Sequence, residues 1–317
     1  MTSILTNNAA MAALQTLRAV DASMQETQAR VSSGLRVGAA SDNAAYWSIA
    51  TTMRSDNMAL SAVEDALGLG AAKIDTAYAA MESALEVVKE IKAKVVAATE
   101  EGVDKFKVQE EIEQLKQQLM SIAESASFSG ENWVAGASGD KTVVSGFTRD
   151  TAGNVRVTQT FYTLVDANDT TTGVVANVLF GMDTSATPAV LDTTTGLIGQ
   201  AGEVSGISIF ELDLREFVTG TPTYTIGELL SDVEAAVQGI TSAAAQLGSI
   251  SMRIGMQEDF ISKLTDSIDS GIGRLVDADM NEESTRLKAL QTQQQLAIQS
   301  LSIANTASES ILTLFRQ

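Results

Sequence analysis

Residues 60–95 read LSAVEDALGLGAAKIDTAYAAMESALEVVKEIKAKV, and this stretch decides the fold. Apolar residues recur in it every seven positions, and apolar or small residues occupy the positions between them. This alternating spacing of three and four places one apolar stripe along a helix, as in a coiled coil. We therefore predict a helix of about five heptads that packs against other helices through the stripe of Leu60, Val63, Leu67, Ile74, Met81, Val88, Ile91 and Val95.

The same spacing continues on both sides of the middle of the chain. A second, shorter stripe contains Ile112, Leu115 and Leu119, flanked by Val108 and Ile122. A third repeats at intervals of seven without a break through Val233, Ile240, Leu247, Ile254, Ile261 and Ile268. We expect helices from the start of the chain to about residue 127, and again from about residue 226 to the end.

The two extreme ends carry thinner apolar stripes. The amino-terminal stripe, broken by Asp21 and Gln28, contains Leu14, Leu17, Met24, Val31 and Leu35. The carboxyl-terminal one, interrupted by Gln294 and Ser308, contains Leu287, Leu290, Ala297, Leu301, Ala304, Ile311 and Phe315. Stripes this polar do not hold a helix securely in isolation, so we interpret both segments as helices that need a partner.

Residues 141–227 have a different texture, rich in Thr, Gly, Val and Asp, and contain both prolines, Pro188 and Pro222. Val155, Val157 and Phe161 fall on one face of an extended run, and residues 205–214 form a second alternating run. We predict a small β-rich domain inserted between helical arms. The predicted fold class is mainly α, with long antiparallel helices built from both chain ends.

The composition argues against catalysis. The chain of 317 residues has no cysteine and no histidine, so thiolate chemistry and the commonest general base and metal ligand are absent. We expect no catalytic residues, no metal site and no cofactor. A net charge of −19 disfavours nucleic acid and anionic membranes as partners. The first residues lack the basic and apolar regions of a secretory signal peptide, which predicts another export route.

Two terminal motifs carry a family resemblance. Residues 30–45 read RVSSGLRVGAASDNAA and closely resemble the amino-terminal signature of bacterial flagellins. Residues 273–280 (GRLVDADM) and 290–297 (LQTQQQLA) resemble the closing helix of that family, and residues 128–132 (FSGEN) resemble its turn after the second long helix. The signature positions are Arg30, Ser32, Ser33, Gly34, Arg36, Asp42, Asn43, Ala44 and Ala45.

The resemblance implies a secreted structural protein that polymerises into the flagellar filament for motility. It implies an inner coiled-coil layer of residues 1–42 with 275–317, a tube layer of 43–140 with 228–274, and a variable surface domain over 141–227. Family members leave the cell through a type III export channel without a cleaved signal peptide. An export chaperone, the filament cap and the hook–filament junction proteins are the implied partners, besides other copies of the chain.

The resemblance also places two segments that innate immune receptors read in flagellins, around residues 30–50 and 90–97. Ser41, Asn43, Tyr46 and Trp47 depart from the residues usual in the first segment, and Glu90-Ile-Lys-Ala-Lys-Val replaces the usual Arg–Glu pattern in the second. We therefore predict weak recognition by both receptors. We favour the simpler interpretation that both stretches pack the helical rod, which is compatible with such recognition, and we expect Trp47 and Trp133 to be buried near its bends.

Two other functions fit the helical ends. A hook–filament junction protein would share them but add only a thin layer of subunits. A secreted type III translocator or adhesin would be built from coiled coils without forming long filaments unaided.

Overall fold

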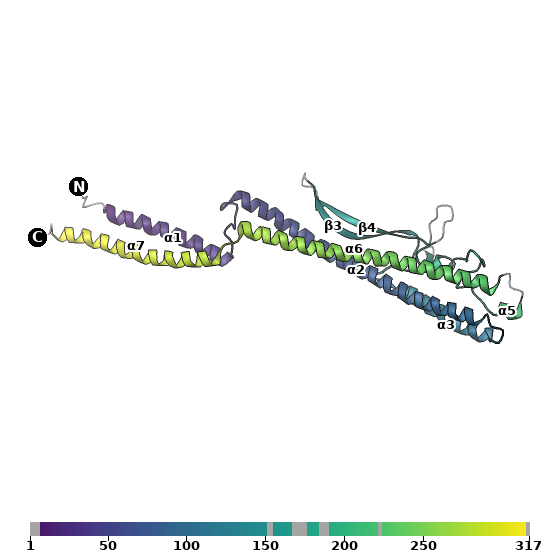
Figure 1. The fold of residues 1–317 in the computed structure, drawn as a ribbon. Helices are drawn as coiled ribbons and strands as arrows, with labels where there is room; N and C mark the ends of the chain where they lie inside the picture. The colour runs from purple at the N-terminus through teal and green to yellow at the C-terminus, as the bar shows by residue number, and fades with distance from the viewer. Residues whose placement is uncertain (1–6, 151–154, 167–175, 184–189, 221–223, 315–317) are drawn as a thin grey trace. The chain divides into compact units, whose positions relative to one another are not determined.

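The computed structural model describes residues 7–150, 155–166, 176–183, 190–220 and 224–314. The chain divides into two compact units: residues 1–58 with 264–317, and residues 59–263. Two long helices, α2 (Ala44–Ala97) and α6 (Ile226–Val276), supply residues to both units. The predicted class of long antiparallel helices drawn from both chain ends, with a few strands in the middle, is confirmed (Figure 1).

The second unit is built on α2, α6 and α3 (Lys105–Ser125). All eight predicted stripe residues of α2 are buried, and so are those of α6 from Val233 to Ile261. Each fully buried Leu, Ile or Val side chain contributes about 1.5–3 kcal/mol, so this seam is the main source of stability in the unit. Lys92 reaches Glu234 of α6 at 2.5 Å and Lys94 reaches Glu111 of α3 at 2.5 Å, which ties all three helices together.

The buried face of α3 differs from the predicted one. Ile112 and Leu119 are buried as expected, but Leu115 is only half-buried, and Gln109 and Lys116 take the adjoining core positions. The reason is a polar anchor: the Lys116 ammonium donates to the Leu212 carbonyl at 2.6 Å. A buried peptide oxygen needs such a partner, and that need outweighs the apolar character of Leu115. Burial in turn lowers the pKa of Lys116.

A tight hairpin follows α3. Strands β1 (Ser127–Phe128) and β2 (Glu131–Asn132) pair around Ser129 and Gly130, whose φ angles are 53° and 82°. Positive φ at both central residues is the geometry of a type I′ hairpin turn. The turn expected over residues 128–132 is thus confirmed.

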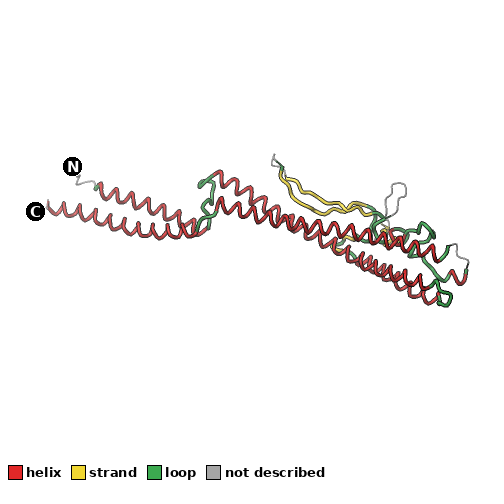
Figure 2. Tube along the Cα trace, in the orientation of Figure 1, coloured by secondary structure: helices red, strands yellow, loops and turns green. Residues whose placement is uncertain are grey.

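The middle of the chain contains a longer hairpin of β3 (Gly139–Arg149) and β4 (Val155–Leu164), drawn in yellow in Figure 2. Its register shifts between Val144 and Gly146, a β-bulge that bends the ribbon. The predicted strand through Val157 and Phe161 is therefore confirmed. On the inner face Tyr162 stacks on buried Trp133 with ring centroids 5.9 Å apart. Two further short strands, β5 (Gly181–Asp183) and β6 (Val190–Asp192), pair with each other.

The predicted strand over residues 205–214 is wrong. This segment lies between two short helices, α4 (Gly196–Gly199) and α5 (Glu216–Thr219), and forms consecutive turns. The Ser208 hydroxyl accepts from the Glu211 amide at 3.0 Å, and the Gln109 amide oxygen accepts from the Leu214 amide at 2.9 Å. Side chains therefore satisfy backbone groups that a strand would have paired with a neighbour.

Among the described residues, no helix carries an apolar stretch long enough to span a membrane.

Candidate functional site

The first unit pairs the two ends of the chain. Helices α1 (Asn8–Ser33) and α7 (Met280–Leu314) lie side by side and antiparallel (Figure 1). We call this pair the terminal hairpin. Two polar contacts fix its alignment along most of its length: the Asn7 side-chain amide donates to the Ala304 carbonyl at 3.0 Å, and the Gln294 amide donates to the Asp21 carboxylate at 2.7 Å.

The seam of the terminal hairpin is only half-buried. On α1 the predicted residues Leu17, Met24 and Val31 face it, whereas Leu14 is 37% exposed and lies at its edge. On α7 the half-buried predicted residues are Leu287, Leu290, Ala297, Leu301 and Ala304. The side chains of Ile311 and Phe315 lie outside the described residues. The stripe prediction missed Ala10, Ala13, Val20 and Thr27, which complete the heptad of α1; small and polar residues in a seam give little hydrophobic signal.

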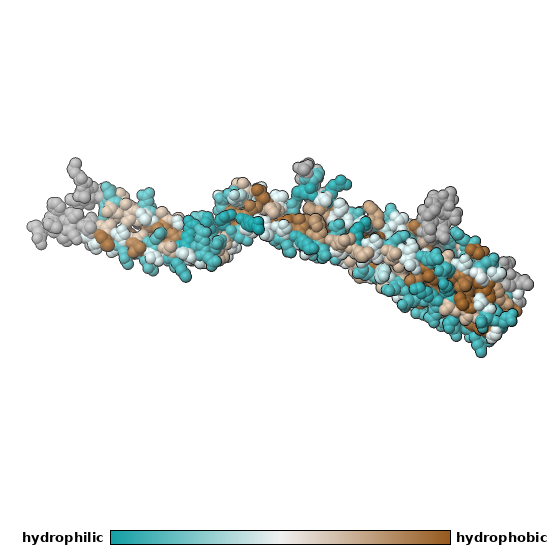
Figure 3. All heavy atoms as spheres, in the orientation of Figure 1, coloured by the Kyte–Doolittle hydropathy of each residue, from teal (hydrophilic) through white to brown (hydrophobic). Residues whose placement is uncertain are grey.

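A second apolar stripe of α7 borders the seam. Leu296 is 58% exposed and Ile303 69% exposed, and they lie seven residues apart on one face of the helix. Leu296 lines an open hollow at the edge of the seam with Ala13 and Val20 of α1. Figure 3 shows apolar residues coming to the surface on the terminal hairpin. Such a stripe is typical of a surface that another molecule covers.

The terminal hairpin ends at a junction made by the signature residues. Gly34 caps α1 with φ +72°, and its amide donates to the Arg30 carbonyl at 2.8 Å. The left-handed conformation suits glycine, which closes many helices in this way. Arg30 also reaches Glu283 at 3.3 Å, so the last turn of α1 is tied to the first turn of α7.

Beyond Gly34 the two chain segments cross the junction as a short antiparallel bridge. Leu35 pairs with Asp277, and the Ala278 amide donates to the Gly34 carbonyl at 2.9 Å. On the other side the Arg36 amide donates to the Val276 carbonyl at 2.7 Å. These bonds join the α1–α2 connection to the α6–α7 connection. The junction is therefore held through the backbone of both chain ends.

A small apolar cluster lies under this bridge. Its buried members are Val37, Ala50, Ile272 and Val276, and Leu35, Met53, Ile268 and Leu275 pack against it. Of the predicted stripe residues, Leu35 and Ile268 thus serve the junction.

Asp42 and Asn43 shape the turn that starts α2. The Asp42 carboxylate accepts from the Gly38 amide at 2.9 Å and the Ala39 amide at 3.0 Å. These bonds, that from Ala39 foremost, lower the pKa of Asp42 below its ordinary value. The Asn43 side chain accepts from the amides of Ala45 and Tyr46 at 3.1 Å each, which caps α2.

The other signature residues are exposed: Ser32, Ser33, Arg36, Ala44 and Ala45. Ser33 helps to shape the turn by accepting from the Leu35 amide at 3.2 Å. Trp133 is buried as predicted, but burial was wrong for Trp47, which is 37% exposed. Trp47 lies in the first turn of α2 and is not among the residues that pack in the apolar cluster, which Ala50 enters from the same helix. Within the signature, Arg30, Gly34, Asp42 and Asn43 are the residues whose contacts shape the junction.

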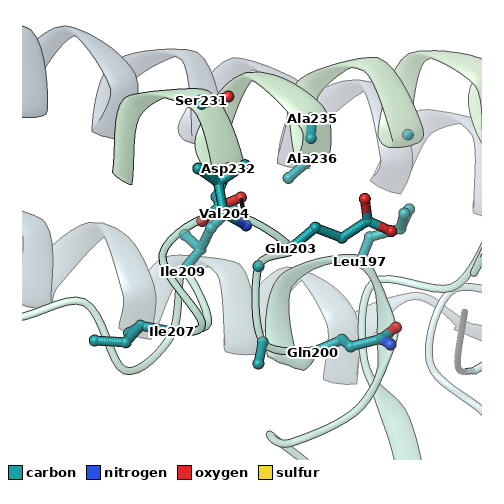
Figure 4. A pocket seen from close by; sticks show the side chains of 14 residues that line it. Leu197, Gln200, Glu203, Val204, Ile207, Ile209, Ser231, Asp232, Ala235 and Ala236 are labelled. Atoms are coloured by element: carbon teal, nitrogen blue, oxygen red, sulfur yellow. Dashed lines mark hydrogen bonds between the residues drawn. The ribbon is translucent and has the colours of Figure 1, made fainter. Parts of the chain in front are cut away.

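The second unit has a pocket of about 420 Å³ between α6 and the loop after α4 (Figure 4). Its buried carboxylate, Asp232, accepts from the Ser205 amide at 2.7 Å and the Val204 amide at 3.1 Å. Gly202 lies so close that a Cβ there would be 2.2 Å from the Asp232 Cγ. Asp232 therefore fastens this loop to α6.

Comparison with known proteins assigns both helical regions to one family. Residues 4–138 match the bacterial flagellin N-terminal helical region, and residues 230–315 match the bacterial flagellin C-terminal helical region. The chain is 53% identical to Flagellin D and to Flagellin C of Rhizobium meliloti (strain 1021), over alignments of 401 and 326 positions, and 43% identical to the flagellin of Brucella melitensis biotype 1. Each alignment covers the whole of both chains.

The matched regions contain the terminal hairpin, its junction and the long helices, and the relatives match along their full length. The prediction of a filament subunit, made from the two terminal motifs, is confirmed over the junction-protein and translocator alternatives. The protein is a structural subunit that polymerises into the extracellular flagellar filament, and the chain belongs to the bacterial flagellin family.

Proposed function

We propose that this flagellin polymerises by completing and burying its terminal hairpin against neighbouring subunits. The observation that carries the proposal is the contrast between two seams of one chain. The α2 stripe is fully buried, whereas Thr27 is the only buried residue of α1, and Glu283 the only one among the described side chains of α7. A helix pair with so little buried apolar surface is marginal in water.

Assembly supplies the missing burial. The exposed stripe of Leu296 and Ile303 leaves apolar surface for further copies of the chain to cover. Ordering the hairpin costs conformational entropy, and that cost falls on the polymerisation step when folding and assembly are coupled. The coupling delays polymerisation until subunits meet a growing end. On this basis residues 1–42 and 275–317 form the inner layer of the filament, residues 43–140 and 228–274 the tube, and residues 141–227 the outer surface.

Single substitutions in the hairpin seam test this proposal. Leu301→Asp and Leu290→Asp place a charge in the half-buried seam, so both variants should stay monomeric when filament seeds are added. Their α2–α6 core should keep its thermal unfolding midpoint, because that seam lies in the other unit. Leu301→Met keeps the apolar volume and is the matched control. Normal seeded growth of both aspartate variants would refute the role of the terminal hairpin.

We propose that the other proteins of the pathway recognise the same terminal segments. An export chaperone would bind the unpaired α7 segment, and the cap and junction proteins would contact the assembled hairpin. A pull-down with residues 280–317 tests the first point, with the Leu301→Asp segment as control. The mass of the subunit in purified filaments shows whether any residues are removed during export.

We also propose weak recognition by innate immune receptors. Lys92 and Lys94 are engaged by Glu234 and Glu111, so this part of α2 presents ion pairs formed within the chain rather than free charges. In the first segment, exposed Tyr46 and Trp47 add bulk where the family pattern has smaller residues. A peptide of residues 29–50 should elicit little response from plant cells, and the monomer little response from an animal receptor reporter. A response of ordinary potency in either assay would contradict this proposal.

A further inference from the structure

The outward face of α6 in the second unit carries an uncharged apolar stripe. Met252, Met256 and Phe260 follow one another at intervals of four residues and are 68%, 65% and 59% exposed. They lie on the side of the helix opposite the buried seam of Leu247, Ile254 and Ile261. The stripe is thus separate from the seam that folds the subunit.

The stripe continues into an open groove. Ala245 and Ser249 extend the same helix face towards the amino end of α6, and the space of about 560 Å³ beside them is closed on the other side by Phe161 of β4. The whole face covers four helical turns, a length of about 22 Å at 1.5 Å per residue. It is long enough to receive a segment of another molecule.

The distribution of charge indicates which kind of molecule occupies the groove beside α6. The chain carries −19 overall, so two copies repel each other across most of their surfaces. This face has no charged residue from Ala245 to Phe260, and the charges beside it are of both signs: Arg253, Asp259 and Lys263. An uncharged apolar strip with mixed charges at its rim is a place where like-charged copies can approach closely.

We infer that the α6 stripe of Met252, Met256 and Phe260 contacts a second copy of this chain in the filament. We infer also that its two methionines make assembly sensitive to peroxide. The inference uses the established polymerisation of the protein and is independent of the terminal hairpin. The contact is heterologous: a different surface of the second copy enters the groove, as the open-ended growth of a filament requires.

The sensitivity of assembly to peroxide, which we call the switch, follows from the chemistry of the methionine thioether. The methionine sulfur attacks an oxygen of hydrogen peroxide, the O–O bond breaks, the sulfur is oxidised to the sulfoxide, and the peroxide is reduced to water. The product is polar and no longer suits an apolar contact. The exposed sulfurs of the monomer are open to this reaction, whereas those of an assembled subunit are covered.

Peroxide footprinting tests directly whether the α6 stripe is covered in the filament. Assembled filaments and monomers obtained from them by heating are treated with hydrogen peroxide, and oxidation of each methionine is followed by peptide mass spectrometry. Met252 and Met256 should react at least about tenfold more slowly in filaments than in monomers, because oxidation follows exposure. Equal rates in the two states would place the stripe against solvent and overturn the inference, whether or not the hairpin variants assemble.

Substitutions test the switch. The double variant Met252→Leu/Met256→Leu keeps the apolar stripe, and we expect it to polymerise normally and to resist inhibition of assembly by pretreatment of the monomer with peroxide. The matched variant Met252→Gln/Met256→Gln should raise the critical concentration for assembly about tenfold, because apolar burial is lost. If the leucine variant stays as sensitive to peroxide as the wild type, other methionines carry the effect and the switch is refuted.

Discussion

Asp21 and Gln294, separated by 273 residues in the chain, meet across the terminal hairpin with the Gln294 amide 2.7 Å from the Asp21 carboxylate. Each residue interrupts the apolar stripe of its own helix, and the two interruptions lie opposite each other. A polar pair within an apolar seam favours one register, because sliding either helix would set the carboxylate or the amide against apolar side chains. The pair therefore specifies how the two ends align.

Breaking this pair should weaken filaments in a coupled manner. We expect Asp21→Ala and Gln294→Ala each to cost about 1 kcal/mol, the usual worth of such a hydrogen bond, which is roughly a fivefold rise in critical concentration. The double variant should cost much less than the sum of the two, because each single change already removes the contact. Strictly additive effects in sedimentation assays of assembly would show that the residues do not interact.

Gly34 should be sensitive to substitution for a purely conformational reason. A Cβ at this position meets nothing within 4 Å, yet the φ of +72° is strained for other residues. We expect Gly34→Ala to destabilise the junction by about 1 kcal/mol and Gly34→Asn by less, because asparagine tolerates the left-handed region. Hydrogen exchange of residues 30–40 in the filament measures the effect. Gly38→Ala, where φ is not positive, is the control and should leave exchange unchanged.

The turn at Asp42 should loosen in acid. Since the pKa of Asp42 is lowered in the folded state, its contribution is complete above the ordinary value of 3.8 and is lost as the pH falls through the lowered one. Exchange of the Gly38 and Ala39 amides, corrected for the intrinsic effect of pH, should therefore rise below about pH 4. Asp42→Asn should show raised exchange at every pH without this transition. A transition of the same size in the asparagine variant would assign it to another group.

Two neighbouring glycines of α2 should respond in opposite directions. A Cβ on Gly70 would lie 2.2 Å from the Val143 Cγ1, whereas one on Gly68 would meet only the Glu258 Oε1 at 3.9 Å. Gly68→Ala should stabilise the subunit by up to about 1 kcal/mol through helix propensity. Gly70→Ala should destabilise it by about 1–3 kcal/mol, because the β3–β4 hairpin must move.

Urea unfolding of the monomer measures both glycine variants. Combining Gly70→Ala with Val143→Ala should recover much of the loss, because the smaller side chain makes room for the added methyl group. If Gly70→Ala were as benign as Gly68→Ala, the hairpin would not rest on α2 at this point.

The long helices were predictable because their evidence repeats. Leu67, Ile74 and Met81 each carry little information alone, but a register kept over five heptads is rarely accidental, and all three proved fully buried. The face of α3 was less predictable, since the burial of Lys116 depends on the Leu212 carbonyl, 96 residues away in the chain. The turns over residues 205–214 escaped prediction because the alternating apolar residues suggest a strand. The Glu211 amide bonds locally to the Ser208 hydroxyl instead, and the Leu214 amide bonds to Gln109, 105 residues away in the chain.

The junction contains features that the local sequence predicts and features that depend on distant residues. Gly34 and Asn43 act through local rules for helix ends, and their roles can be read from their neighbours in the sequence. The bridge between Leu35 and Asp277 leaves no mark in either segment alone. Backbone pairing depends on where two distant segments meet, and no side-chain pattern records it.

The separation of α1 from α7 also sets an order in time. At about 5–20 residues per second, the 273 residues between Asp21 and Gln294 take roughly 14–55 s to synthesise, so the first helix waits that long for its partner. The same delay applies in proportion whenever the chain emerges from a narrow passage with its amino end first. The terminal hairpin therefore cannot close before the last helix of the chain has emerged. The length of the chain therefore sets a minimum delay before α1 can pair with α7.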